Sequence, residues 1–233
     1  MSHAVWRQPT ILPYQVHKVP LLQNCLDGYY RGRALRSMNI QESECPTVPP
    51  TQMGLYERVM GAKWTLLHET LRHLHGGALQ RSATGKLRIR RNSCLAARII
   101  LKLASLPSES AATPTSLTVR VRGTKEEWER DFSGLRVMSI QQAEGPLLIE
   151  AFGRLAICFR LEAQNGGLQF MQERAQVRLG ALHVAVPSIV APEVSATEVP
   201  VDEDGFWVNV SITIPAIGLL LAYEGLVHLE TDL

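Results

Sequence analysis

The feature that most constrains the fold is a change of sequence period near Pro114. Beyond it, apolar and polar residues alternate, and Gly, Pro or Asn-Gly interrupts the alternation at short intervals. A period of two indicates β-strands rather than helices. The interruptions include Gly145-Pro146, Gly153-Arg154 and Asn165-Gly166-Gly167. Because connections this short join antiparallel neighbours, and parallel strands need long crossovers, we predict an antiparallel meander.

The alternation defines a run of nine or ten sequential strands. The candidate strands are Leu117–Arg122, Trp128–Phe132, Leu135–Gln141, Leu147–Phe152, Leu155–Ala163, Leu168–Val177, His183–Val186, Val194–Val199, Phe206–Ile214 and Leu219–Leu229. Such a sheet accumulates twist and tends to close, because closure removes exposed edges. We therefore expect a calycin-like up-and-down barrel or half-barrel, of a size that holds one small ligand.

Two helices are expected before the meander. From Leu55 to Leu74 apolar residues recur at three- and four-residue spacing, and Gly76-Gly77 ends the pattern. A second helical stretch, 93–104, has apolar Leu95, Ile99, Ile100 and Leu103, with Arg98 and Lys102 outward, and it stops before Pro107. The predicted fold class is α+β, mainly β, with two N-terminal helices.

Residues 1–53 differ in character from the rest of the chain. They contain six prolines and little periodicity, which favours an irregular N-terminal arm. The helix pair and the barrel then form one domain over residues 54–233. The composition, 45% hydrophobic and 20% charged, excludes disorder of the whole chain.

The four cysteines and the first residues indicate the compartment. No C-x-x-C pair occurs, and prolines and charges interrupt the first 25 residues where a signal peptide has an apolar core. We therefore expect a reduced, cytoplasmic protein with no membrane span.

One predicted strand places a carboxylate among apolar side chains. Leu148 and Phe152 flank Glu150 on the same face of 147–152. A buried carboxylate is either protonated, with a raised pKa that suits a general acid or base, or paired with a cation. The candidate cations are Arg130 and Arg160 on adjacent strands.

Aromatic and amide side chains supply candidate ligand-binding residues. Strand 206–214 has one apolar face, and its other face carries Trp207 and Asn209. That second face either lines a cavity or meets water. We name Trp207, Tyr223 and Asn209 as candidate ligand-binding residues, with Glu150, Arg130 and Arg160 as candidate catalytic residues.

Charge is segregated along the chain although the net charge is only +2. Eight Lys or Arg residues and no acidic residue occur from Arg72 to Lys102, and no Lys or Arg follows Arg178. Either the basic segment lies against the acidic half, or it contacts an acidic partner. Nucleic acid is disfavoured, because no stacking aromatic residue occurs between Trp64 and Trp128.

Cofactor and metal motifs are not found. There is no G-x-G-x-x-G, and the Thr84-Gly85-Lys86 segment lacks the first glycine and the Ser/Thr of a phosphate loop. His68 and His73 are five residues apart, so on a helix they point in different directions. We expect no cofactor and no metal.

The order of several short motifs resembles an uncharacterised bacterial family of domains of unknown function. The motifs include Leu55–Gly61, Trp128–Phe132, Glu150–Gly153, Val186-Pro187 and Tyr223–Gly225, and they extend from Leu55 to about Leu229. Members of this family occur alone or fused behind saccharopine-dehydrogenase-like reductase domains. The resemblance implies no catalytic residues; the fusion implies small-molecule metabolism by association only.

Two functional hypotheses follow. In the first, the barrel binds a small hydrophobic molecule, and the catalytic form of this hypothesis is a cofactor-independent cyclase or isomerase of a biosynthetic intermediate. Glu150 would then be the acid or base, Arg130 or Arg160 would stabilise an oxyanion, and Tyr223 and Trp207 would orient the substrate. In the second, a non-catalytic domain contacts an acidic partner through residues 72–102.

Overall fold

The computed structural model describes residues 53–179 and 182–230, which lie in one compact unit. The expected arm, 1–53, lies outside the described residues except for its last position. The helices are α1 (Leu55–Met60), the 3-10 helix η1 (Gly61–Leu66), α2 (Glu69–His75) and α3 (Leu95–Leu103). The strands are β1 (Gln80–Arg91), β2 (Ser110–Arg122), β3 (Lys125–Phe132), β4 (Leu135–Glu144), β5 (Leu147–Phe152), β6 (Leu155–Gln164), β7 (Gly167–Leu179), β8 (Leu182–Ala185), β9 (Glu193–Pro200), β10 (Gly205–Ile214) and β11 (Gly218–Leu229).

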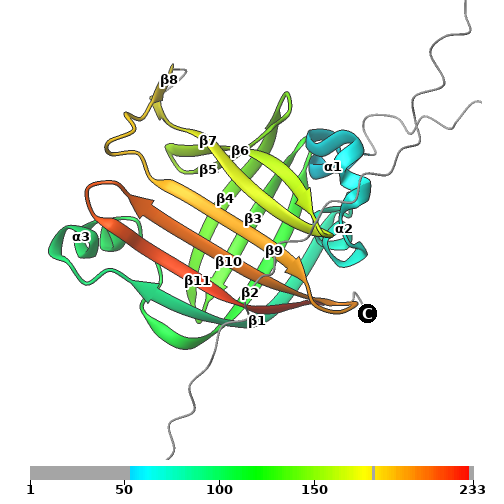
Figure 1. Ribbon diagram of the computed structural model, residues 1–233, viewed down its shortest axis with the longest axis horizontal. Coiled ribbons are helices and arrows are strands. Elements are labelled where there is room, and N and C mark those ends of the chain that lie inside the picture. Colours follow the sequence, from blue (N-terminus) through cyan, green and yellow to red (C-terminus); the bar gives the residue numbers. More distant parts are fainter. Residues whose placement is uncertain (1–52, 180–181, 231–233) are drawn as a thin grey trace, which may run out of the picture. The chain divides into compact units, whose positions relative to one another are not determined.

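The strands form a closed antiparallel barrel (Figure 1). The order is β6-β5-β4-β3-β2-β1-β11-β10-β9-β7-β8, and a further pairing of β6 with β7 closes a ring of ten strands. Strand β8 pairs only with β7 and stands outside the ring. The prediction of an up-and-down barrel is therefore confirmed. Of the two forms that the sequence left open, the structure has the closed barrel and not the half-barrel.

Alternation places one face of each strand inside the barrel. On β6, Ile157, Phe159 and Leu161 are buried in the core, and the partly buried Leu155 packs against it. The Asn165-Gly166 turn joins β6 to β7 with both residues at positive φ, 51° and 79°, as a tight two-residue hairpin requires. The predicted strands and turns of the meander correspond closely to β2 to β11.

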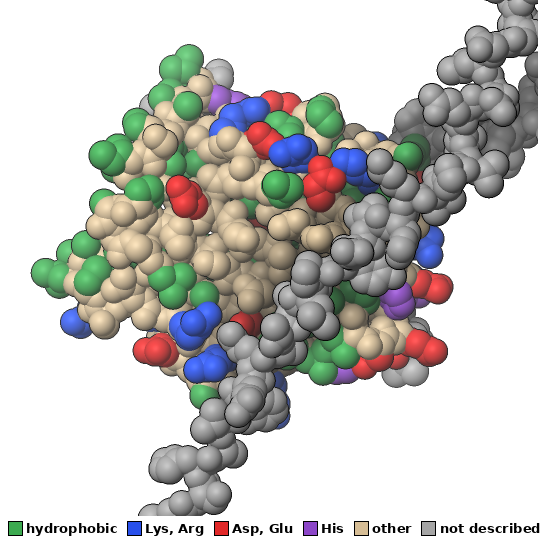
Figure 2. All heavy atoms as spheres, viewed as in Figure 1, with side chains coloured by type: hydrophobic (Ala, Val, Ile, Leu, Met, Phe, Trp, Pro, Cys, Tyr) green, Lys and Arg blue, Asp and Glu red, His purple; other side chains and the backbone are tan. Residues whose placement is uncertain are grey.

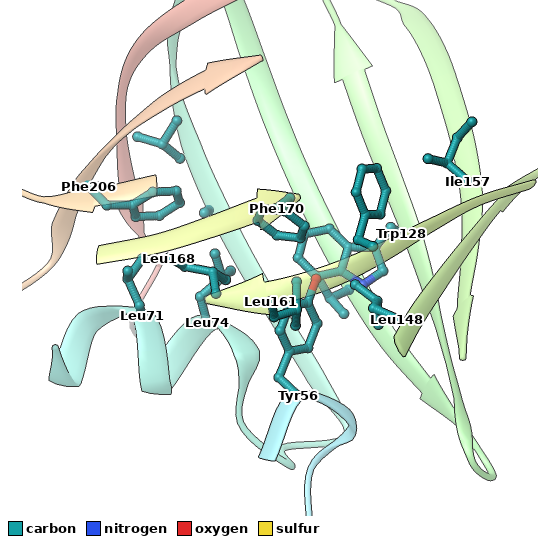
Figure 3. Close-up of a cluster of buried hydrophobic side chains, with 14 of the residues drawn as sticks. Tyr56, Leu71, Leu74, Trp128, Leu148, Ile157, Leu161, Leu168, Phe170 and Phe206 are labelled. Carbon is teal, nitrogen blue, oxygen red and sulfur yellow. The ribbon is translucent and has the colours of Figure 1, made fainter. Parts of the chain in front are cut away.

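The first predicted helix is in fact two helices. Gly61 adopts φ 55° and ends α1, and η1 then leads to α2. The apolar stripe is nevertheless the packed face, because Tyr56, Leu71 and Leu74 are all fully buried. Figure 3 shows α1 and α2 below the barrel with these side chains directed into it. This helical segment plugs one end of the barrel.

The second predicted helix is confirmed as α3, which lies at the end of the barrel opposite α1 and α2 (Figure 1). Its packed residues are Ala97 and Leu101, both fully buried, and Ile100 is half-buried. The basic residues from Lys86 to Arg91, which precede α3, lie in the second half of β1, a strand that is not among the ten predicted ones. Among the helices of the described residues, none has the length and apolar character to cross a bilayer.

Candidate functional site

The inside of the barrel holds a small cavity with both apolar and polar walls. Its volume is about 100 Å³, whereas one water molecule needs about 10–15 Å³ in the same measure. Its apolar wall includes Phe132, Phe170 and Val208, and its polar wall includes Arg130, Glu150 and Tyr223. The cavity therefore has room for a small part of a ligand, not for a large molecule.

A larger apolar pocket lies between the barrel wall and α3. Its volume is about 510 Å³, and Ile100 of α3 faces the barrel residues Leu155 and Ile212 across it. Val194 of β9 lines both this pocket and the inner cavity. The two spaces therefore share part of a wall, and α3 lines the outer one.

Glu150 and Arg130 form an ion pair in the cavity wall. The distance from Arg130 Nη2 to Glu150 Oε1 is 2.9 Å, and Ser139 donates its hydroxyl to the same oxygen at 2.6 Å. Arg130 also donates through Nη1 to the Ser139 oxygen at 2.9 Å. Of the two alternatives expected for Glu150, the structure therefore shows the one in which the carboxyl group is paired with a cation.

The electrostatics of the pair hold Arg130 charged. Burial alone would lower the pKa of Arg130, but the attraction of the Glu150 carboxylate and the hydrogen bond to it raise that pKa above its usual value. The guanidinium also lies 5.2 Å from the centre of the Trp128 ring. The cavity wall thus carries a fixed positive and a fixed negative charge side by side.

Tyr223 is the one predicted ligand-binding residue that lines the cavity. Its ring packs edge-on against Phe132, with 5.6 Å between the ring centres. Among the described residues, no hydrogen-bond partner is found for its hydroxyl. Burial, followed by the nearby Glu150 and Glu198, raises the pKa of Tyr223, so the phenol is neutral and able to donate.

Three predicted site residues lie outside the cavity. Trp207 is 43% exposed, and Asn209 is exposed and bonds to Glu224 on the outer surface of the barrel. Arg160 pairs with Glu173 at 2.9 Å, also on the outside. The physical reason is the period of two: the apolar residues of β6 and β10 face inward, so their polar neighbours face water.

Sequence reasoning missed a second polar group at the bottom of the cavity. His75, at the end of α2, is fully buried, and its Nε2 lies 2.6 Å from Glu198 Oε2. The Tyr56 ring contacts the His75 ring at a tilt, with 3.9 Å between the ring centres, and the Tyr56 hydroxyl donates to Gln141 Oε1 at 2.8 Å. The available signal was Glu198, which shares the inward face of β9 with Val194 and Ala196.

The basic segment 72–102 is not one surface. Arg72 is exposed on α2, and Arg81 is buried in an ion pair with Glu126 at 2.9 Å. Arg88 lies opposite Glu224 in the β1–β11 register, which agrees with partial cancellation of the two charged regions. The exposed basic side chains are therefore divided between α2 and the part from β1 to α3.

These observations define a class of protein: a closed up-and-down β-barrel, plugged at one end, with an internal cavity that adjoins an apolar pocket. The chain belongs to the family of domains of unknown function DUF4166, whose model matches residues 67–227. The family resemblance seen in the sequence is confirmed to that extent. No curated protein and no solved structure matches the chain.

Proposed function

We propose that the barrel binds a small, mostly apolar molecule that carries one neutral polar group. The apolar body occupies the pocket under α3, and the polar group reaches the cavity wall at Tyr223. This proposal is supported by the lining of the pocket, which among the described residues is apolar apart from Arg136 and Ser105, and by Val194, which lines both spaces. Pockets that combine an apolar wall with few polar groups are typical of ligand sites.

The observation that carries the proposal is the Tyr223 hydroxyl. This hydroxyl has no hydrogen-bond partner among the described residues, whereas the other polar side chains that line the cavity form hydrogen bonds or ion pairs. The Tyr223 side chain is partly buried, so its unpaired hydroxyl can donate to a ligand oxygen and add a hydrogen bond to the apolar contacts. A hydroxyl or carbonyl oxygen of the ligand is the complement of this group.

The charges of the cavity favour a neutral ligand over an anion. Arg130 is already neutralised by Glu150, and His75 lies against Glu198. A ligand carboxylate placed at Tyr223 would lie near the acidic side chains of Glu150 and Glu198. Neither Arg130 nor His75 could neutralise it, because each already lies against one of these two residues. An alcohol or a ketone avoids that repulsion, so we expect binding to discriminate against the matched acid.

Displacement of a fluorescent apolar probe, 1-aminoanthracene, tests the proposal with three ligands of equal chain length. We expect 1-decanol and 2-decanone to displace the probe, and decanoate at pH 8 to bind at least about tenfold more weakly. Tyr223→Phe should lower the affinity for decanol by about five- to tenfold, which corresponds to the loss of one hydrogen bond, without changing the affinity for the probe.

A matched control uses a predicted site residue on the outer surface. Arg160→Met should leave probe and decanol binding unchanged, because the Arg160–Glu173 pair lies outside the barrel. Failure of all three ligands to displace the probe, or equal affinity for decanol and decanoate, would overturn the proposal. Native mass spectrometry of the protein from its own host would then identify any co-purified molecule.

Catalysis by a cyclase or isomerase stays a prediction that no observation tests. Glu150 accepts two hydrogen bonds, which suits a base or an acceptor better than a proton donor. Turnover of a candidate intermediate by the protein, lost in Glu150→Gln, would support it. The association with reductase domains that the resemblance implies favours a metabolic intermediate as ligand.

A further inference from the structure

Helix α3 leaves an apolar stripe unpacked. Leu95, Ile99 and Leu103 are 71%, 52% and 82% exposed. They are spaced four residues apart, so at about 100° per residue they lie within an arc of about 80° on one side of the helix. Ala97 and Leu101, which pack against the barrel, lie on the other side. The outward face of α3 is therefore apolar, the reverse of an ordinary surface helix.

The apolar surface continues beyond α3 at the same end of the barrel. Ile189 and Val190, in the connection between β8 and β9, are 70% and 54% exposed, and Leu182 on β8 is 64% exposed. Figure 1 shows α3, β8 and this connection at the end opposite α1 and α2. Figure 2 shows hydrophobic side chains gathered over these elements. We call this end of the barrel the α3 rim.

Basic side chains flank the apolar stripe. Arg98 and Lys102 lie on one side of it, and α3 contains no acidic residue. Arg91 lines the same groove beside α3 as Arg98 and Lys102. Among the described residues that line this groove, Glu109 supplies a single carboxylate. Within residues 53–179 and 182–230, none of these three cations forms an ion pair within 4 Å. Their charge is therefore available to a partner.

We propose that the α3 rim docks on an anionic lipid bilayer. An apolar helix face bordered by Lys and Arg is the pattern of helices that lie in a membrane interface, with the apolar side chains among the acyl chains and the cations at the headgroups. Charge complementarity selects anionic lipid over neutral lipid. The apolar stripe distinguishes this partner from nucleic acid, which would use the cations but not Leu95, Ile99 and Leu103.

Docking in this orientation would bring the ligand pocket to the bilayer. Ile100, next to the exposed stripe, lines the pocket under α3. An apolar ligand would then pass between bilayer and barrel without crossing water, which reduces the cost of its transfer. The docking itself goes beyond the proposed ligand binding and does not depend on it, because the exposed stripe and the cations are present without a ligand.

Vesicle co-sedimentation of the full chain tests the proposal. We expect at least about tenfold more protein bound to phosphatidylcholine vesicles containing roughly 30 mol % phosphatidylglycerol than to phosphatidylcholine alone, and less at about 0.5 M salt. Ile99→Asp with Leu103→Asp should abolish binding by removing the apolar contact. Arg98→Glu with Lys102→Glu should abolish the preference for anionic vesicles.

Matched controls lie at the opposite end of the barrel. Leu79→Asp changes a side chain that is 79% exposed near α2, and Arg122→Glu with Lys125→Glu reverses two charges at the β2–β3 turn. These variants should bind vesicles like the wild type. Far-UV circular dichroism shows whether each variant keeps its fold, and binding of 1-aminoanthracene without vesicles tests the pocket, so the two proposals fail separately.

Two outcomes would overturn the docking proposal. One is wild-type protein that stays in the supernatant with anionic vesicles. The other is vesicle binding that Ile99→Asp with Leu103→Asp leaves unchanged. In either case, binding of a fluorescent single-stranded oligonucleotide should then be measured. Oligonucleotide binding that is lost in Arg98→Glu with Lys102→Glu, but kept in Ile99→Asp with Leu103→Asp, would assign the basic surface to nucleic acid instead.

Discussion

Arg130 and Glu150 are joined across the strand that separates them. Their side chains come from β3 and β5 and meet at 2.9 Å inside the barrel, and Ser139 of the intervening β4 hydrogen-bonds to both. Three adjacent strands therefore contribute to one polar cluster in an apolar interior. Each contact in the cluster offsets part of the free-energy cost of removing these polar groups from water. Loss of one member therefore leaves the others buried without a partner.

Glu150→Leu should be strongly destabilising. The substitution leaves the Arg130 guanidinium largely buried without a carboxylate, and removing one partner of a buried pair costs about 3 kcal/mol or more. The free energy of unfolding in urea, measured by circular dichroism, gives the loss directly.

Two variants control for this prediction. Arg130→Met combined with Glu150→Leu removes both charges and should be more stable than Glu150→Leu alone. Arg160→Met breaks the exposed pair with Glu173 and should cost less than about 1 kcal/mol. A Glu150→Leu protein as stable as the wild type would show that Arg130 is hydrated in the cavity rather than dependent on its pair.

Two tyrosines should respond differently to loss of the hydroxyl. Tyr56→Phe leaves the buried Gln141 without its donor, so the free energy of unfolding should fall by about 1–3 kcal/mol. Tyr223→Phe removes a hydroxyl that has no protein partner among the described residues, so stability should hardly change. Urea denaturation of both variants checks this, and equal losses would contradict the assignment of Tyr223 as a ligand-binding group.

Stability should fall at alkaline pH. Burial, reinforced by Glu198 and Glu126, raises the pKa of Tyr56 well above its ordinary value of 10.0, and Tyr223 is shifted in the same direction. The folded protein then keeps protons that the unfolded chain loses, so this contribution is complete below pH 10 and decreases above it. Each tyrosine contributes a slope of about 1.4 kcal/mol per pH unit. Urea denaturation between about pH 9 and 11 should show a shallower slope for Tyr56→Phe than for the wild type.

Gly85 marks the closest approach of two strands. A Cβ at this position on β1 would overlap the backbone carbonyl oxygen of Leu226 on β11. Gly85→Ala should therefore cost about 1–3 kcal/mol, and Gly85→Val more, because the neighbouring backbone must move. Gly123 is the control: its φ is +64° with open space around it, so Gly123→Ala should cost only the backbone strain of a positive φ, about 1 kcal/mol. A smaller loss for Gly85→Val than for Gly85→Ala would contradict this.

The strands could be predicted because each has one buried face and a short turn. Inward-facing Leu155 and Ile157 alternate with outward residues on β6, and Asn165-Gly166 fixes the next turn. The interruption of the first helix was not predictable from periodicity, because the apolar spacing continues through Gly61. A glycine inside a helical pattern is often tolerated, and here its positive φ ends α1.

The site was predictable where a polar residue shares a face with apolar ones. Glu150 satisfied that rule and lies in the cavity wall. Trp207 and Asn209 were chosen from the polar face of β10, which alternation directs outward. His75 could not be assigned from the sequence, because its partner Glu198 lies on a strand that follows 123 positions later. Such a contact depends on how α2 enters the barrel, not on local pattern.

The size of the inner cavity gives the last prediction. Ala196 of β9 lines the cavity, and Ser195 beside it is exposed. Ala196→Leu adds apolar volume to a space of about 100 Å³, so it should leave the free energy of unfolding within about 1.5 kcal/mol of the wild type. The same change should lower the affinity for decanol at least about tenfold, because the polar group of the ligand no longer reaches Tyr223. Ser195→Leu adds the same side chain on the outside and should not affect binding. Unchanged affinity in Ala196→Leu would move the ligand out of the cavity, and the pocket under α3 would then be the whole of the site.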